Sequence, residues 1–299
     1  MSIERPSLSR RVVLTGGLAA AVGAVAAVAA VAGCSPRTAD TTAPARTDAS
    51  PTPSPTPTPT PTPATAQEIA ARATVPVLCY HQVRPYAAND TSYNRQQLII
   101  PPDAFGRHLD AIREAGYTTI DPAAYHAHLA NGAKLPDKPL IMSFDDGKDN
   151  QPQNALPALT KRGMVGTWFI MSVVIGNPGW TTADQIRRAA DAGHTIGCHT
   201  WDHHDVRKYT AADFTKQFDG ARATLQKYSG QPVDSFAFPY GAWNEAALPH
   251  LAKAGFTTAY QLTEKPLDPK LPQLTLRRQL AVSTWSGAEL VAQLEKLTA

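Results

Sequence analysis

From about residue 75 onward, short apolar runs alternate with amphipathic stretches. Short apolar runs bounded by turn residues are typical of buried strands, and apolar positions spaced three and four apart are typical of helices that face a core. The pattern predicts strands at Val75–Tyr80, Thr118–Ile120, Pro139–Phe144, Gly166–Met171, Thr195–Cys198, Ser235–Phe238, Thr257–Leu262 and Leu276–Val282, and helices at about 103–115, 122–130, 149–162, 182–192, 210–228, 244–254 and 286–297.

Several predicted helices end in a glycine that comes just before a strand, at Gly116, Gly163, Gly193 and Gly255. Glycine after the last helical residue readily adopts the left-handed conformation that ends a helix. A helix that feeds directly into a strand is half of a parallel unit. About seven or eight such units predict an α/β fold of the TIM-barrel kind, with an open doubly wound sheet as the alternative.

The first 34 residues predict an export signal. The pair Arg10–Arg11 precedes an Ala- and Gly-rich apolar run, Leu14–Val31. This run is short and weakly hydrophobic for a spanning helix, which needs about 20 apolar residues, but it suits a twin-arginine signal. It ends at Val31-Ala32-Gly33-Cys34, which is similar to a bacterial lipobox, so we expect an extracytoplasmic protein with a lipid anchor at Cys34. A signal or anchor with an incidental Cys is the alternative.

Residues 35–74 predict a disordered linker that is rich in Pro and Thr. A Pro-Thr repeat favours extended polyproline II at about 3.1 Å per residue, so the linker could hold a domain up to ~100 Å from the lipid. The remaining residues, 75–299, are enough for one domain with a full core.

Charge and cysteine content exclude two classes of protein. The chain has 28 basic and 25 acidic residues, a formal charge of +3, which is too small an excess to indicate a nucleic-acid partner. Three cysteines make no disulfide framework. Cys79 and Cys198 are expected as buried free thiols, with a bridge between them as the alternative. We expect a monomer.

Polar residues follow the predicted strands immediately, where the chemistry of parallel barrels gathers. Asp145 and Asp146 end one strand before Gly147. Adjacent residues on an extended chain point opposite ways, so their roles should differ. One carboxylate could bind a metal while the other serves as a base, and a helix N-cap pair is the alternative.

A histidine cluster follows another strand, at His199-Thr200-Trp201-Asp202-His203-His204. Histidines four apart share one face of a helical turn, which is a natural spacing for one metal ion. Two imidazoles and one Asp would leave coordination positions open for water. On helical spacing we prefer His203 to His204 as the second ligand. Coincidence is the alternative.

Two further strand ends carry candidate groups. Phe236-Ala237-Phe238-Pro239-Tyr240-Gly241 predicts a rigid turn in which a backbone N–H, such as that of Tyr240, could face a developing oxyanion. A plain βα turn is the alternative. His81 closes the first strand, and a lone His there is more often structural.

Together these motifs resemble the polysaccharide deacetylase family, carbohydrate esterase family 4, over about residues 75–299. Ser143-Phe144-Asp145-Asp146-Gly147 is similar to its first motif, and His199-Thr200-Trp201-Asp202-His203 to its second. The resemblance implies a distorted (β/α)7 barrel, with Asp145 as general base and Asp146, His199 and His203 as metal ligands.

The sequence departs in two places from the usual motifs of this family. Ala237 stands where an Arg usually precedes the Pro-Tyr pair, and no acid-His motif occurs near the C-terminus. Both departures resemble the poly-β-1,6-N-acetylglucosamine deacetylase branch, which implies that His81 is the catalytic acid. Arg277 and Arg278 are the candidates for the Arg that orients the base.

The sequence therefore predicts a metal-dependent N-deacetylase that releases acetate from an extracellular N-acetylglucosamine polysaccharide. The expected ion is divalent and preferably Zn, with Ni, Co or Fe as alternatives. Pro239, Trp201 and Trp243 are the candidate substrate-binding residues. A peptidoglycan or chitin-oligomer deacetylase is one alternative, and a catalytically weak glycan-binding surface lipoprotein is another.

Overall fold

The computed structural model describes residues 63–262 and 265–298. The chain divides into two units, Met1–Pro57 and Thr58–Ala299, and the described residues all belong to the second. The predicted export signal, the anchor at Cys34 and most of the predicted linker lie outside the described residues. These features stay predictions.

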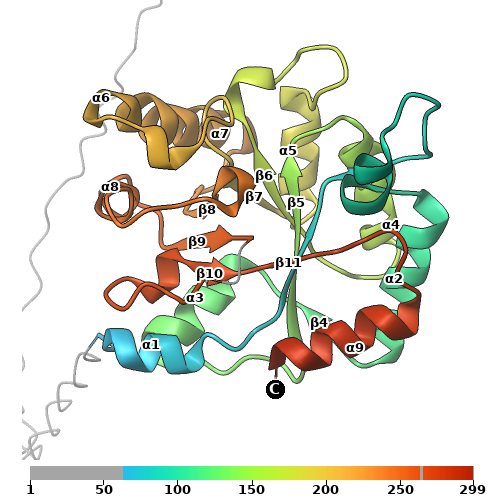
Figure 1. Cartoon of the computed structure of the whole chain (residues 1–299), viewed down its shortest axis with the longest axis horizontal. Helices are drawn as coiled ribbons and strands as arrows, with labels where there is room; N and C mark the ends of the chain where they lie inside the picture. Colours follow the sequence, from blue (N-terminus) through green and yellow to red (C-terminus); the bar gives the residue numbers. More distant parts are fainter. Residues whose placement is uncertain (1–62, 263–264, 299) are drawn as a thin grey trace, which may run out of the picture. The chain divides into compact units, whose positions relative to one another are not determined.

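Parallel strands form the centre of the described unit (Figure 1). Hydrogen-bonded neighbours follow the order β10-β9-β8-β7-β6-β5-β1-β11, and β4 adds to β5. A separate parallel pair, β2 with β3, stands outside this sheet. The strands are β1 Val77–Tyr80, β2 Gln82–Val83, β3 Ile99–Ile100, β4 Thr118–Thr119, β5 Pro139–Asp146, β6 Thr167–Ile170, β7 Thr195–Cys198, β8 Ser235–Ala237, β9 Thr258–Gln261, β10 Leu276–Arg277 and β11 Gln279–Leu280.

The last strand brings the two edges of the sheet together. β10 pairs with β9 and β11 pairs with β1, while Arg278 alone separates β10 from β11. Counted as one strand, β10–β11 gives seven strands on the path around the sheet. The predicted distorted (β/α)7 barrel is confirmed, and the open doubly wound sheet is not what forms.

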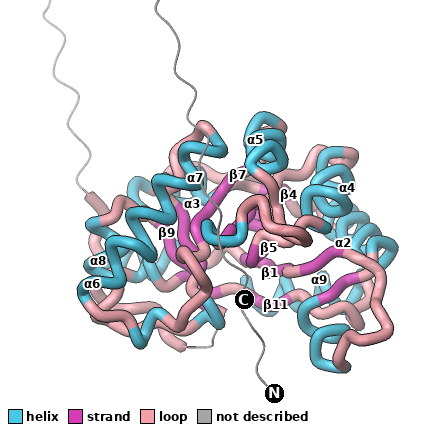
Figure 2. The backbone as a smooth tube through the Cα atoms, turned by 90° about the horizontal axis from the view of Figure 1, so that it is seen from above, coloured by secondary structure: helices cyan, strands magenta, loops and turns pink. Residues whose placement is uncertain are grey.

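Helices surround the strands (Figure 2). Burial of an apolar stripe on each helix against the outer face of the barrel is the main favourable term of this packing. The α-helices are α1 Ala66–Arg72, α2 Pro102–Glu114, α3 Pro122–Asn131, α4 Leu156–Thr160, α5 Ala183–Asp191, α6 Ala211–Phe214, α7 Ala221–Ser229, α8 Leu248–Lys253 and α9 Gly287–Thr298; the 3₁₀ and π turns are η1 Asn94–Leu98, η2 Gln151–Ala155, η3 Ser172–Val174, η4 Val206–Lys208, η5 Thr215–Gly220, η6 Pro239–Gly241 and η7 Pro272–Leu274.

The period of two along each strand separates an inner from an outer core. The outer core lies between strands and helices, and its aromatic rings stack at Tyr80, Phe144 and Trp168. The inner core fills the barrel and includes Phe169 and Tyr260.

Gly197 belongs to the inner face of β7 and makes room for Phe169. A Cβ atom there would lie 2.4 Å from Cδ1 of Phe169. A glycine at this point of the strand is therefore required by the packing of the barrel interior.

The structure differs from the sequence-based expectations in local detail. The predicted helices at 149–162 and 210–228 each contain a π segment, η2 and η5. The small sheet β2–β3 was not predicted, because two-residue strands carry no periodic signal. Helix α1 lies within the stretch 35–74 that was assigned to the linker, and it packs against α3. Regular structure that packs on the barrel domain is therefore present before residue 75.

Both described cysteines, Cys79 and Cys198, are buried and free, as expected. Among the described residues, none of the helices combines the length and the apolar character that crossing a membrane requires.

Candidate active site

One cavity lies at the end of the barrel where the parallel strands finish. Its volume is about 410 Å³. Side chains from the ends of several strands reach it, because the carboxyl ends of parallel strands share one face of a barrel. Its lining residues are His81, Tyr93, Leu98, Asp145, Asp146, His199, His203, Tyr240, Leu262 and Leu280.

The two adjacent carboxylates at the end of β5 point to different places, as the alternation along a strand predicts. Asp145 continues the inner face of the strand and is buried. Asp146 leaves the extended conformation, with φ of 78°, and stays partly exposed to the cavity. The two groups are therefore separated in environment as well as in direction.

Asp146 forms a trio of metal-type side chains with His199 and His203. Nε2 of His199 lies 3.6 Å from Oδ1 of Asp146, and Nε2 of His203 lies 3.5 Å from the same oxygen. The ligand atoms of all three residues lie within 4.8 Å of one another. This predicted trio is brought together by the fold.

Hydrogen bonding fixes which nitrogen of His199 can bind an ion. Nδ1 lies 2.8 Å from the carbonyl oxygen of Ala237 and donates to it, which leaves the lone pair of Nε2 facing Asp146. Such a partner is typical of metal-binding histidines. Burial lowers the pKa of the His199 imidazole to about 4 and also lowers the pKa of His203. Both imidazoles are therefore neutral at physiological pH.

The two histidines do not lie on a helical turn, so the predicted helical spacing was wrong, although the two side chains do meet at one place. Thr200 and His203 both have φ of 67°, and the backbone turns sharply between the imidazoles. The N–H of His203 donates to Oγ1 of Thr200 at 2.9 Å, which closes the turn. His204 instead pairs with Asp202 and is largely exposed, so His203 rather than His204 faces Asp146.

Arg278 holds the carboxylate of Asp145 with both terminal nitrogens. Nη1 donates to Oδ1 at 2.6 Å and Nη2 donates to Oδ2 at 2.7 Å, and both side chains are buried. Burial on its own would raise the pKa of the Asp145 carboxyl, but the charge and the hydrogen bonds of Arg278 outweigh it. The pKa lies well below the usual value. Asp145 is therefore an ionised carboxylate that is fixed in position.

The two candidate arginines have different partners, and only Arg278 contacts Asp145. Arg277 is exposed on the outside, where its Nε donates to the carbonyl oxygen of Lys265 at 3.1 Å. Arg278, the next residue, is buried and pairs with Asp145 instead.

His81 lines the same cavity from the end of β1. Its Nδ1 lies 4.0 Å from Sγ of Cys79. Gln151 ties the two strand ends together, because its Nε2 donates to the carbonyl oxygens of His81 and Asp145 at 2.6 and 2.5 Å. Sequence reasoning did not find Gln151, which lies in a stretch predicted only as a helix.

The stretch of chain that holds most of this site matches a known protein family. Residues 132–259 match the model of the polysaccharide deacetylase family. This stretch contains Asp145, Asp146, His199, His203 and Tyr240. The chain carries a polysaccharide deacetylase domain.

Individual members of this family show the same relationship. YxkH of Bacillus subtilis, named as a polysaccharide deacetylase, is 27% identical over 190 residues, which cover 64% of this chain and 63% of that protein. The peptidoglycan-N-acetylmuramic acid deacetylase PdaA of Bacillus subtilis is 27% identical over 165 residues, 54% of this chain and 56% of that protein. A poly-beta-1,6-N-acetyl-D-glucosamine N-deacetylase of Staphylococcus aureus is 27% identical over 170 residues, 52% of this chain and 58% of that protein. The chain thus spans less than two thirds of the length of these relatives.

A solved structure confirms the deacetylase fold. The deacetylase PplD of Streptococcus pyogenes, in complex with acetate, superposes with a TM-score of 0.68 at 22% identity, over 74% of this chain and 97% of that one.

The predicted substrate-binding residues of the deacetylase domain are only partly at the cavity. Trp243 is buried, and its Nε1 donates to Oε1 of Gln261 at 3.1 Å, so it is a packing residue. Trp201 packs against the core, with Nζ of Lys216 3.0 Å from its ring centroid. Neither indole lines the cavity.

The turn that follows β8 reaches the cavity as expected. Pro239 is buried and supports the turn, while the Tyr240 ring is exposed and lines the cavity. Tyr240 has φ of 59°, a left-handed backbone conformation that a Tyr rarely adopts. Together with Asp146, Thr200 and His203, it places four of the five described non-glycine residues with positive φ around this site. Strained backbone of this kind clusters at functional sites.

Proposed function

We propose that this chain is a metal-dependent deacetylase that hydrolyses N-acetyl groups of an extracellular N-acetylglucosamine polysaccharide, and that poly-β-1,6-N-acetylglucosamine is its substrate. One observation carries the proposal. Asp146, His199 and His203 converge with ligand atoms within 4.8 Å of one another, beside the buried Asp145–Arg278 pair.

The donor set fits a divalent metal. One carboxylate and two neutral imidazoles are ligands that zinc takes at catalytic sites, with positions left open for water and substrate. Nickel, cobalt and iron accept the same donors. Orientation of His199 by the Ala237 carbonyl supports this fit. When bound, the ion supplies Lewis-acid polarisation of the acetyl carbonyl and lowers the pKa of water.

Each remaining group has one task in hydrolysis of the amide. Asp145, kept ionised and oriented by Arg278, accepts a proton from the attacking water as general base. The backbone N–H of Tyr240 donates to the acetyl oxygen as negative charge develops on it. His81 donates a proton to the sugar nitrogen as the C–N bond breaks. The products are acetate and a glucosamine unit, whose amine then becomes cationic.

Two features favour the β-1,6-linked substrate. His81 reaches the cavity from the first strand, where the corresponding branch is expected to carry its acid. A Staphylococcus aureus relative acts, by its name, on that polymer. The similarity to the peptidoglycan deacetylase PdaA makes peptidoglycan the substrate to compare with it.

Acetate release from three substrates tests the proposal. The metal-loaded protein is incubated with β-1,6-linked N-acetylglucosamine oligomers, chitin oligomers and peptidoglycan. We expect the fastest release from the β-1,6 oligomers and no release after chelation. Faster release from peptidoglycan or chitin would reassign the substrate. A metal-loaded protein that releases acetate from none of them would instead be a glycan-binding protein.

We also propose that the protein is exported and anchored by lipid at Cys34, and that it is a monomer. The support for the anchor is the apolar run that ends in Val31-Ala32-Gly33-Cys34. In cells labelled with a fatty acid, the Cys34→Ser variant should lose the label and leave the membrane fraction. Light scattering should give the monomer mass, and a dimer mass would contradict that expectation.

A further inference from the structure

The rim of the cavity carries two exposed tyrosines. Tyr93 is 63% exposed and Tyr240 is 65% exposed, the highest values among the exposed large hydrophobic side chains of the described residues. Both line the cavity that contains Asp145 and the metal-type trio. An isolated surface aromatic ring needs no explanation, but two at one cavity do.

The two rings stand on opposite sides of the barrel mouth. Tyr93 follows β1 and β2, whereas Tyr240 follows β8 directly. Around the seven-strand path, β1 and β8 are four steps apart in one direction and three in the other. The metal-type trio comes from the end of β5 and from the chain after β7, and both strands lie on the four-step arc between β1 and β8.

The segment that carries Tyr93 is tied down by hydrogen bonds. Arg84 donates from Nη2 and Nη1 to the two oxygens of Asp90 at 2.7 and 2.9 Å. Arg95 donates to the carbonyl oxygens of Ala87 and Asp90, and Ser283 donates to the carbonyl oxygen of Arg95 at 2.6 Å. The segment is thus a preorganised rim that presents Tyr93 at a set position.

The ring of Tyr240 is also held in place. It meets the His203 imidazole edge to face, with centroids 4.6 Å apart and planes at 75°. Contact with His203 places this ring beside the metal-type trio. Leu98, Leu262 and Leu280 complete the walls with apolar surface.

A groove continues from the cavity past Tyr240. Its volume is about 450 Å³, and it shares His203 and Tyr240 with the cavity. Tyr209 and Gln217 line its far part. A chain molecule can therefore extend from Tyr93 across the metal-type trio and on into the groove.

From this arrangement we propose that Tyr93 and Tyr240 stack on successive pyranose rings of a polysaccharide, so that the protein acts on internal units of the chain. Tyr240 packs on the sugar that loses its acetyl group, and Tyr93 packs on a neighbouring sugar. The apolar C–H face of a pyranose ring suits the face of an aromatic ring, which buries apolar area while hydroxyl groups remain in water. This inference rests on the proposed function and names the residues that hold the polymer.

Binding and turnover of Tyr93 variants test the inference. Calorimetry measures the affinity of the metal-free protein for a β-1,6-linked N-acetylglucosamine pentamer, and acetate release measures kcat and KM for the pentamer and the dimer. We expect Tyr93→Ala to weaken pentamer binding and raise its KM by about 5- to 10-fold, as the loss of one aromatic contact predicts. Its kcat should change little, and Tyr93→Phe should keep wild-type values.

A matched control lies in the same segment. Tyr86 is exposed but does not line the cavity, and its hydroxyl donates to Oγ of Ser283. Tyr86→Phe keeps the ring and should leave pentamer affinity unchanged. Equal weakening by Tyr86→Phe, or wild-type affinity in Tyr93→Ala, would overturn the inference. Because binding is measured without turnover, a protein that binds the pentamer through Tyr93 but releases no acetate would refute the proposed function alone.

Discussion

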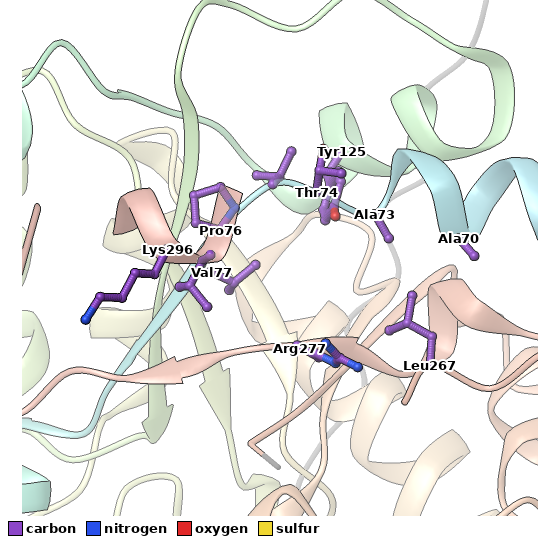
Figure 3. Close-up of a pocket in the computed structure, with 11 residues that line it drawn as sticks. Ala70, Ala73, Thr74, Pro76, Val77, Tyr125, Leu267, Arg277 and Lys296 are labelled. Atoms are coloured by element: carbon purple, nitrogen blue, oxygen red, sulfur yellow. The ribbon is translucent and has the colours of Figure 1, made fainter. Parts of the chain in front are cut away.

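Two hollows of similar size lie at opposite ends of the barrel, and only one of them has the features of an active site. The pocket in Figure 3, of about 340 Å³, lies at the amino-terminal end of β1. Its polar groups do not converge, since Lys296 extends away from Arg277 (Figure 3). The cavity at the carboxyl ends gathers five Asp and His side chains, three of which form the metal-type trio. Volume does not mark the site, whereas converging side chains and strained backbone do.

The difference follows from the direction of parallel strands. Residues at the carboxyl ends pass into loops that can adopt unusual conformations, such as the left-handed residues Asp146 and His203. At the amino ends, the chain arrives from helices through short connections with mostly apolar side chains. The barrel thus separates the chemistry at one end from packing at the other.

The largest expected effect comes from removing the carboxylate that both histidines face. Asp146→Ala should abolish acetate release, because the candidate ion would lose its only described carboxylate ligand in the trio. Metal content by mass spectrometry should fall to near zero. Wild-type metal content in this variant would refute the ligand role.

His81→Ala should lower kcat by about 10²–10⁴-fold while the metal stays bound, as the loss of a general acid predicts. Acetate release under saturating substrate measures the effect, and metal analysis is its control. Unchanged turnover would remove His81 from the mechanism.

Arg277 and Arg278 are adjacent at the junction of β10 and β11. Their variants compare the outside of the barrel with its inside. Arg278→Met leaves the buried carboxylate of Asp145 without its partner, which should destabilise the fold by about 3–5 kcal/mol and lower turnover. Arg277→Met, on the exposed side, should change the free energy of unfolding by less than about 0.5 kcal/mol. Urea denaturation measures both, and equal effects would contradict the assignment.

Buried histidines should make stability depend on pH. Burial lowers the pKa of His108, His194 and His199. Below pH about 6.5, the unfolded chain therefore binds more protons than the folded chain. The metal-free protein should lose stability as the pH falls from there toward about 4, which is the pKa of His199. Denaturant midpoints at several pH values measure this slope. A midpoint that rises as the pH is lowered would show the sign to be wrong.

The smallest effect is expected at the amino-terminal pocket. Lys296→Ala should leave acetate release unchanged and shift stability by no more than about 0.5 kcal/mol, as is usual for surface substitutions. A large loss of activity would show that the pocket in Figure 3 is coupled to the cavity at the other end.

One residue that the sequence left open could have been predicted from strand alternation. Leu276 belongs to the inner core, so its second neighbour, Arg278, must also point inward, toward Asp145. Tyr93 and Gln151 had no comparable signal. Tyr93 lies in a polar stretch without periodicity. The contacts of Gln151 are with the carbonyl oxygens of His81 and Asp145, which are 70 and 6 residues away in the sequence.

The sequence by itself determined the alternation of strands and helices, the barrel, and the identity of the groups at the strand ends. These properties depend on local periodicity and on the common direction of parallel strands. The tertiary structure alone decided that His199 and His203 meet through a left-handed turn, that Arg278 holds the carboxylate of Asp145, and that tyrosines rather than Trp201 and Trp243 reach the cavity. Each of these depends on contacts between residues far apart in the chain, which packing selects and which no local pattern encodes.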